Sequence, residues 1–420
     1  MLTVAFQSFP DFSNNSRALF QYMYKKYKNK MKFIWVIKDN DIKKKIPEKN
    51  VEVLVVDQDN LHEKLTNVDV FFSTHANLID YKIQNSNTLY IELWHGVSPK
   101  KVGYLINNMN ESDYKWLNKI QSKIDYFIVP SEFWTPIFSA RFNILPERIL
   151  PLGFPMLDNI VNASGKENLS KVIDCDLSKY EKIIYYMPTA RLGFGRNEEV
   201  SPNLENTLNL KPYNEKDLIT YLEKNNYLLC VKYHPSEELN LKVEEGKNVR
   251  FIKNDMLKKN GFDVNMILNA ADLMISDYSS LGLLFLILNK PVLYLASDEK
   301  DYAKSRGILF NDFSFWTDGD EVTTLEELLT KIDYKFNNSD ERIKARKKLF
   351  FGNLNDGGCS NIVDYFFDKN GNLNKDIKYT FDENYALKQK NNSLQEELNN
   401  IYNSKGYKLL EKLRKVRYRR

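Results

Sequence analysis

Histidine and cysteine are scarce in this chain, which has four histidines and three cysteines among its 420 residues. Cys175, Cys230 and Cys359 are odd in number and far apart, so they predict no disulfide framework and suit a reducing cytoplasm. Walker A and G-x-G-x-x-G patterns, a serine-hydrolase elbow and clusters at metal-ligand spacing are also missing. The sequence therefore lies outside these common classes. We expect no metal-ligand residues and no cofactor, and dependence on a divalent ion is left open.

Long hydrophobic runs are missing as well. The longest one, SLGLLFLILNKPVLYLA, is interrupted by Asn289, Lys290 and Pro291, whereas a membrane-spanning helix needs roughly 20 apolar residues. The N-terminus, MLTVAFQSFPDF, has neither the basic nor the apolar region of a signal peptide, so we expect a soluble main body. Lys and Arg number 60 against 56 Asp and Glu, and this near balance indicates no particular partner.

Runs of β-branched and aromatic residues alternate with helical stretches over the first third of the chain. Continuous apolar strands separated by helices are typical of a parallel sheet covered on both faces. The same rhythm restarts after a polar stretch, residues 153–182, which we interpret as an inter-domain linker. Strands are expected at residues 2–6, 33–38, 51–56, 69–74, 88–93, 123–131, 182–190, 227–235, 248–254, 272–280 and 291–296.

The fold class that this pattern predicts is α/β, with two doubly wound parallel-sheet domains facing across a cleft and a C-terminal helical tail. We place an N-terminal domain at residues 1–165, a second α/β domain at 166–367, and a linker with short helices at 368–420. In such folds ligands bind beyond the carboxyl ends of the strands. The functional site is therefore expected in the cleft.

The tail differs in composition from the body. Leu387, Leu394, Leu398 and Ile401 have heptad spacing over fewer repeats than a secure coiled coil needs. Residues 404–420 contain eight basic residues and one acid, with apolar residues on one helical face. Such a helix favours docking on an anionic membrane surface, although a solvated tail or a nucleic-acid patch would have a similar charge. Because the body shows no nucleic-acid module, we expect no nucleic-acid partner.

Two histidines follow apolar strands in corresponding positions of the two halves. His95 in IELWHGVSPKK precedes Gly96, which allows close backbone approach, and an imidazole there could serve as a general base. His234 in YLLCVKYHP could donate a hydrogen bond to a phosphoryl oxygen. Singly, each could equally be an ordinary loop or turn residue. Of the other two, His62 resembles a surface helix residue, whereas His75 also ends a strand and could line the cleft.

Two further segments suit phosphate binding. In DLMISDYSSLGLL, a strand ends at Asp277, and Ser279 and Ser280 precede an apolar helix whose free N–H groups could hold an anion. In YYMPTARLGFGR, Thr189 and Arg191 supply a hydroxyl and a guanidinium. The alternatives are an ordinary helix cap in the first segment and a solvated basic loop in the second.

Taken together, WHGVSPKKVGY, GFPMLD, YMPTAR, KYHP and SDYSSLGLLFLILNKPVLYL resemble the CDP-glycerol glycerophosphotransferase family, which makes teichoic-acid and capsule polymers. The motifs occur in the family's order over most of residues 1–345. The chain departs from the family at Val97, Ser98 and Pro99 after WHG, and at Ala190 and Leu192 around Arg191; Met156 also replaces a common arginine. CDP-glycerol and CDP-ribitol therefore both stay open as donors.

The resemblance implies a GT-B-like fold and transfer of a polyol phosphate, chiefly glycerol phosphate, to a hydroxyl of a lipid-linked or growing cell-surface polymer with release of CMP. It implies that His95 deprotonates the acceptor and that His234 acts with it in catalysis. It places Asp277 and Arg306 near the donor nucleotide. The remaining implied residues bind the donor pyrophosphate: Thr189, Arg191, Ser279 and Ser280.

The family's chemistry also implies a peripheral location at the cytoplasmic face of the cell membrane; the oligomeric state is left open. Two alternatives remain at the level of sequence. One is a nucleotide-sugar glycosyltransferase on the same fold. The other is a non-catalytic membrane scaffold, which the departures after His95 and around Arg191 keep open.

Overall fold

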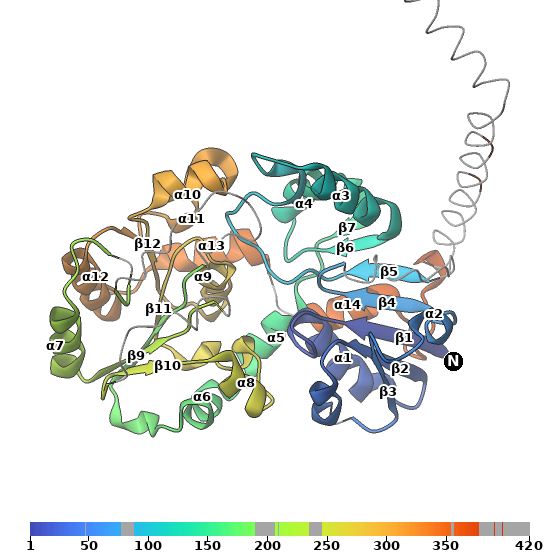
Figure 1. Ribbon diagram of the computed structural model, residues 1–420, viewed down its shortest axis with the longest axis horizontal. Coiled ribbons are helices and arrows are strands. Elements are labelled where there is room, and N and C mark those ends of the chain that lie inside the picture. Colours follow the sequence, from blue (N-terminus) through green and yellow to red (C-terminus); the bar gives the residue numbers. More distant parts are fainter. Residues whose placement is uncertain are drawn as a thin grey trace, which may run out of the picture.

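The computed structural model describes residues 1–46, 48–76, 88–189, 206–208, 210–234, 246–353 and 357–377, together with the single residues 390 and 397. It contains two parallel sheets in two lobes that face each other (Figure 1). The predicted fold class of two doubly wound α/β domains is confirmed for this part of the chain. The heptad segment and residues 404–420 lie outside the described residues.

The first lobe is built on a seven-stranded sheet in the order β3-β2-β1-β4-β5-β6-β7. Its strands are almost continuously apolar because helices cover both faces, and β1, for example, buries its last four residues. The strands are β1 Leu2–Gln7, β2 Met31–Ile37, β3 Val51–Val55, β4 Val70–Ser73, β5 Leu89–Glu92, β6 Tyr126–Ile128 and β7 Ile149–Leu150. The helices are α1 Asn14–Tyr27, α2 Leu61–Lys64, α3 Glu111–Lys123 and α4 Trp134–Phe142.

The second lobe is built on a six-stranded parallel sheet in the order β10-β9-β8-β11-β12-β13. In both sheets the strand order reverses beside the first strand, between β1 and β4 and between β8 and β11. These are the points where doubly wound sheets bind ligands. The strands are β8 Lys182–Tyr186, β9 Tyr227–Val231, β10 Val249–Phe251, β11 Leu273–Ser276, β12 Val292–Leu295 and β13 Glu321–Val322. The helices are α7 Glu215–Asn225, α8 Asn254–Lys259, α9 Ser280–Phe285, α10 Glu299–Ser305, α11 Ser314–Thr317, α12 Leu325–Asn337 and α13 Glu341–Phe351.

The polar stretch 153–182, which was expected to be an inter-domain linker, joins the last strand of the first sheet to the first strand of the second, but its helices were not expected. It forms α5 Pro155–Asn162 and α6 Gly165–Ile173, and α5 packs against both lobes (Figure 1). The prediction followed the overall polarity of the stretch. Apolar residues three and four positions apart nevertheless place Met156, Leu157 and Ile160 on one buried helical face.

The chain crosses back to the first lobe near its end. Helix α14, Gly358–Phe366, packs on α1 and α5, and Asp364 forms a 3.0 Å ion pair with Lys26. Figure 1 shows α14 beside the first sheet. The two sheets lie on either side of residue 165. The range 166–367 stays a prediction as a folding unit, and its last helix is part of the first lobe's packing.

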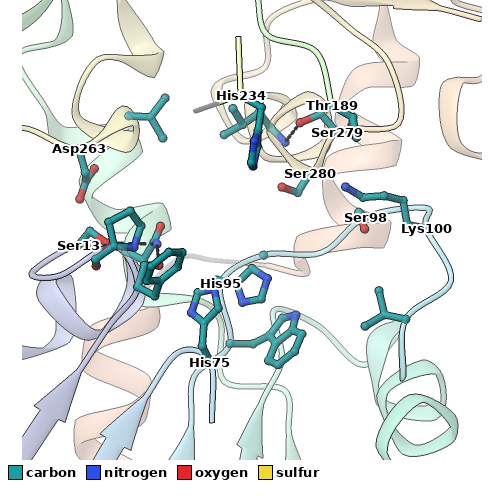
Figure 2. A pocket seen from close by; sticks show the side chains of 18 of the residues that line it. Ser13, His75, His95, Ser98, Lys100, Thr189, His234, Asp263, Ser279 and Ser280 are labelled. Atoms are coloured by element: carbon teal, nitrogen blue, oxygen red, sulfur yellow. Dashed lines mark hydrogen bonds between the residues drawn. The ribbon is translucent and has the colours of Figure 1, made fainter. Parts of the chain in front are cut away.

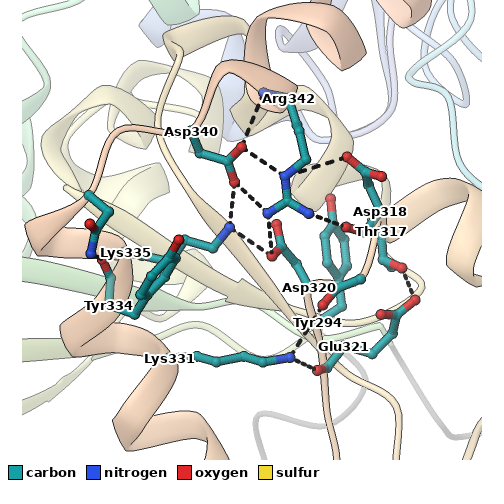
Figure 3. A network of polar contacts seen from close by, with 12 residues as sticks. Tyr294, Thr317, Asp318, Asp320, Glu321, Lys331, Tyr334, Lys335, Asp340 and Arg342 are labelled. Carbon is teal, nitrogen blue, oxygen red and sulfur yellow. Dashed lines mark hydrogen bonds and ion pairs between the residues drawn. The ribbon is translucent and has the colours of Figure 1, made fainter.

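A buried ion network fixes the outer edge of the second sheet (Figure 3). The ammonium of Lys335 on α12 lies 2.7 Å from carboxylate oxygens of both Asp320 and Asp340. Arg342 on α13 contacts the same Asp340 oxygen at 2.7 Å, and this hydrogen bond is the main reason that the pKa of Asp340 is lowered. Every buried charge in this group has an opposite partner, as burial requires. The network thereby joins α12 and α13 to the loop before β13.

Within the described ranges, no helix combines the length and apolar composition that crossing a bilayer requires.

Candidate active site

A cleft of about 1550 Å³ lies between the two lobes, at the carboxyl ends of both sheets. Residues from both lobes line it, and Figure 2 shows His75 and His95 of the first lobe facing His234 and Ser280 of the second. The two lobes also touch beside the cleft, where Arg17 on α1 donates to the carbonyl of Gly261 at 3.0 Å.

His95 lies just beyond β5, on a loop with unusual backbone geometry. The backbone of Trp94 has φ +53° and that of Gly96 has φ +145°. Residues that have a Cβ atom rarely adopt such positive φ values. A Cβ on Gly96 would lie 3.4 Å from the Cβ of Ser280, so the glycine lets the second lobe approach the loop closely. The sharp turn places the imidazole in the cleft directly after the strand.

The ring of His95 is oriented by the main chain of the neighbouring strand. Its Nδ1 lies 3.0 Å from the carbonyl oxygen of Thr74, which can only accept a hydrogen bond. The proton of the neutral ring is therefore on Nδ1, and Nε2 carries the lone pair. Burial is the main reason that the pKa of His95 falls to about 4, with Lys100 and Arg141 adding to the effect. The free ring is neutral near pH 7, as a general base must be.

Two buried polar residues hold this loop. The carboxyl group of Glu92, at the end of β5, accepts from the N–H groups of Trp94 and Ala76, both at 2.8 Å. The amide nitrogen of Asn15 on α1 donates to the carbonyls of Leu93 and Trp94, while its oxygen accepts from the N–H of Met156. The backbone that leads into His95 is thus connected to β5, α1 and α5.

The second lobe has a matching arrangement beyond β8 and β11. The carboxylate of Asp277, 1 % exposed, accepts from the N–H of Thr189 at 2.8 Å and from the N–H of Ser279 at 3.1 Å. Ser279 caps α9, because its hydroxyl accepts from the N–H of Leu281. One buried acid therefore sets the positions of two loops whose residues Thr189 and Ser279 line the cleft.

His234 follows β9 and faces the first lobe across the cleft (Figure 2). Its pKa is lowered, first by burial and then by the positive charges of Lys232 and Lys100. All three side chains line the cleft. An anion placed between them would raise the pKa of His234 and strengthen it as a hydrogen-bond donor.

The family model for CDP-glycerol:poly(glycerophosphate) glycerophosphotransferases matches residues 2–367. The chain belongs to this family. It is 29% identical over 368 residues to the teichoic acid glycerol-phosphate primase of Bacillus subtilis (strain 168), a match that covers 84% of this chain and 89% of that protein. It is 24% identical over 292 residues to the teichoic acid ribitol-phosphate polymerase TarL of Staphylococcus aureus (strain NCTC 8325 / PS 47), covering 66% of this chain and 48% of that protein.

The solved structure of the wall teichoic acid polymerase TagF has a similar fold. The TM-score is 0.69 at 23% identity, over 94% of this chain and 90% of that chain. This likeness confirms the GT-B-like arrangement of two parallel-sheet domains. The family model also confirms the family resemblance seen in the sequence motifs.

The structure of this family member brings most of the predicted site residues into one cleft. Asp277 is the exception among those described, because it is buried beneath Thr189 and Ser279 and acts on the cleft through them. Arg191 lies outside the described residues. The predicted residues that line the cleft are His95, Thr189, His234, Ser279, Ser280 and Arg306. Their chemical roles stay predictions.

Several cationic residues of the cleft were missed at the level of sequence. Lys100 and Lys232 lie within the quoted motifs, so their neighbours could have indicated them. The sequence did not indicate Arg141 as a cleft residue, because an arginine on a helix such as α4 is expected to lie at the protein surface. It is 1 % exposed, and its Nη2 donates to the carbonyls of Ser98 and Lys100, both at 3.0 Å. Burial alone lowers its pKa to about 9, so it stays mostly charged near pH 7.

Among the described residues, no group of three or more His, Cys, Asp or Glu side chains could hold a metal ion. The lysine and arginine residues that line the cleft are Arg17, Lys38, Lys45, Lys100, Lys101, Arg141, Lys232, Lys258 and Arg306.

Proposed function

We propose that the protein transfers glycerol phosphate, or a related polyol phosphate such as ribitol phosphate, from a CDP-linked donor to a hydroxyl group of a lipid-linked or growing cell-surface polymer, releasing CMP. The observation that supports this most is the position of His95. Its Nδ1 is occupied by Thr74 O, and its ring lies opposite His234 and Ser280 in one cleft (Figure 2). A base from one lobe thereby faces anion-binding groups from the other.

The chemical step joins the acceptor oxygen to the β-phosphorus of the donor. The acceptor proton passes to Nε2 of His95 while the new P–O bond forms. The bond between the β-phosphorus and the bridging oxygen breaks, and CMP leaves with that oxygen and its electron pair. This in-line displacement needs positioning and charge stabilisation more than covalent participation by the protein.

The charge of the cleft suits this step. The donor pyrophosphate would lie among Thr189, His234, Ser279 and Ser280, with Arg191 from outside the described part of the chain. Its negative charge offsets the nearby cations that help to lower the pKa of His95. Donor binding therefore makes His95 a stronger base at the stage when it must accept a proton. Arg306 at the end of α10 lies in the same cleft and is proposed to contact the nucleotide.

Because the proposed acceptor is lipid-linked or part of a cell-surface polymer, we also propose that the protein works at the cytoplasmic face of the cell membrane. There residues 404–420 would bind the anionic surface peripherally. This part of the proposal rests on the sequence of the tail, with its eight basic residues and one acid.

The test is a panel of CDP-glycerol, CDP-ribitol and UDP-sugars, each incubated with the full-length protein and a soluble acceptor analogue. Release of CMP together with extension of the acceptor supports the proposal. Release of UDP from a sugar donor would instead establish a glycosyltransferase. Absence of turnover with every donor would favour the scaffold alternative. His95→Ala should lose at least about 100-fold in kcat, whereas His62→Ala on α2, which is not among the cleft residues, serves as the matched control.

A further inference from the structure

A second imidazole lies directly against the ring of His95. His75 follows β4 at the point where the strand order of the first sheet reverses, and it lines the same cleft. The two ring centroids are 3.9 Å apart and the planes are 10° from parallel (Figure 2). The step described above uses His95 but gives no role to this neighbour.

Thr74 contacts both rings through different atoms. Its carbonyl oxygen lies 3.0 Å from Nδ1 of His95, and its hydroxyl oxygen lies 2.9 Å from Nδ1 of His75. The same hydroxyl oxygen accepts a 3.3 Å hydrogen bond from the N–H of Phe9. Thr74 is fully buried, so its hydroxyl proton needs an acceptor within the protein.

These contacts assign the tautomers of both histidines. The carbonyl of Thr74 can only accept, so His95 carries its proton on Nδ1. Among the described residues, the acceptor in reach of the Thr74 hydroxyl proton is Nδ1 of His75. His75 therefore carries its proton on Nε2, the nitrogen directed away from Thr74. One threonine thus gives two stacked imidazoles opposite tautomers.

We infer that His75 is a hydrogen-bond donor of the active site, whose Nε2–H binds a non-bridging oxygen of the phosphoryl group while His95 accepts the acceptor's proton. This inference rests on the proposed function for its chemistry, but the tautomers rest on the Thr74 contacts alone. A donor placed where charge develops in the transition state stabilises it. Thr74 is a positioning residue, since it acts only through the two rings.

The neutral state of His75 is part of this arrangement. Burial is the main reason that its pKa falls to about 2, and electrostatic interactions with His95 and Lys38 lower it further. His75 therefore does not compete with His95 for the transferred proton. When His95 becomes an imidazolium, the adjacent ring is still neutral, so no pair of like charges forms within the stack.

The first experiment measures the tautomers without any turnover. With only four histidines in the chain, long-range ¹H–¹⁵N spectra of ring-labelled protein can be assigned with single His→Gln variants. We expect a protonated Nδ1 in His95 and a protonated Nε2 in His75. Thr74→Val keeps the main-chain carbonyl and removes the hydroxyl, so it should change the ring signals of His75 and leave the tautomer of His95 intact. Thr74→Ser should match the wild type. A proton on Nδ1 of His75 in the wild type would overturn the inference.

The second experiment tests the contact with phosphate. Titration with inorganic pyrophosphate should move the Nε2–H signal of His75 downfield, and an unchanged signal at saturation would overturn the inference. In turnover, His75→Phe keeps a stacking ring but has no N–H, and should lower kcat on the order of 10²-fold. His75→Gln restores a donor near the Nε2 position and should recover part of this loss. His62→Gln is the control.

The two proposals fail in different ways. If the wild type turns over no CDP-polyol, the proposed function fails, while the spectra and the pyrophosphate titration still decide the role of His75. If the wild type is active and His75→Phe keeps full kcat, the proposed function stands and the inference about His75 is wrong. Thermal unfolding of each variant distinguishes loss of the hydrogen-bond donor at position 75 from loss of the fold.

Discussion

Glu92 accepts a 2.8 Å hydrogen bond from the N–H of Trp94, the residue that precedes His95. Its second carboxyl oxygen accepts from the N–H of Ala76, the residue that follows His75. One buried side chain at the end of β5 therefore holds both loops that carry imidazoles into the cleft. Asp277 does the same for Thr189 and Ser279 in the second lobe. Each lobe thus uses a buried acid beneath the cleft to position two neighbouring loops.

Glu92→Gln should destabilise the protein by about 1–3 kcal/mol, because an amide offers one oxygen and an NH₂ group where two N–H donors need acceptors. The displaced loops should also lower kcat on the order of tenfold. Chemical denaturation and steady-state kinetics measure the two effects. Glu111→Gln, an exposed residue at the start of α3, is the control and should change the free energy of unfolding by less than about 0.5 kcal/mol. Equal stability of the Glu92 and Glu111 variants would contradict the assigned contacts.

The raised pKa of Glu92 predicts how the free energy of unfolding depends on pH. Burial raises the pKa of Glu92 from 4.5 to about 8. Between these values the unfolded chain has lost this proton while the folded protein still holds it, so stability falls as pH rises. The slope is at most about 1.4 kcal/mol per pH unit. The difference in unfolding free energy between wild type and Glu92→Gln should therefore shift in favour of the variant from pH 5 to pH 8. A difference that is constant with pH would show that Glu92 is ionised in the folded state.

Much of the fold was predictable because its signals are local. Apolar runs such as residues 33–38 and 69–74 are short and rich in β-branched and aromatic residues, which predicts strands. The helical stretches between such runs imply parallel sheets. Periodicity was harder to see where polar residues dominate. The stretch 153–182 was interpreted as a linker because its buried residues, such as Met156 and Ile160, occupy only one face of α5.

The site was only partly predictable because contacts between distant segments create it. His95 and His234 were indicated by their places after strands. The opposite tautomers of His95 and His75 depend on the register of β4 beside β5, which brings Thr74 to both rings. The spacing of residues in the sequence does not indicate that Thr74 contacts both histidine rings. Arg141 was missed for the same reason, since its burial results from the loop of residues 98–100 packing over α4.

The pH dependence of turnover tests His95 as the base. Its pKa is lowered from 6.5 to about 4, so the free enzyme should keep the ring neutral well below pH 6. We expect kcat/KM to stay level from pH 8 down through pH 6, with its acidic limb lying below the ordinary histidine range. Measurement of kcat/KM between pH 4.5 and 8.5, with folding checked at each pH, decides the point. A limb centred near pH 6.5 would indicate a solvent-exposed base instead.

Arg141 should act on donor binding through the loop that it supports and through its charge. Arg141→Met keeps most of the side-chain volume but removes the hydrogen bonds to Ser98 O and Lys100 O and a buried positive charge. We expect the KM for the CDP-linked substrate to rise about tenfold or more. Each hydrogen bond from the charged guanidinium contributes about 1.5–3 kcal/mol, and without these bonds the loop that carries Lys100 is held less firmly in the cleft. Arg148→Met removes a half-buried arginine of the same lobe that is not among the cleft residues. If both variants raise KM equally, the effect of Arg141 is general destabilisation.

The basic composition of residues 404–420 predicts a membrane contact, which can be tested independently of catalysis. Deleting residues 404–420 removes eight basic residues and one acid, and each basic residue near an anionic surface contributes about 1 kcal/mol. The truncated protein should sediment less with vesicles containing phosphatidylglycerol, while its turnover of a soluble acceptor stays unchanged. Replacing Arg417, Arg419 and Arg420 by Gln isolates the charge from the apolar face and should give an intermediate result. Binding of the full chain should weaken as NaCl rises from 0.1 to 0.5 M, because exposed charges are screened. Equal sedimentation of the full and truncated chains would show that the tail does not hold the protein at the membrane.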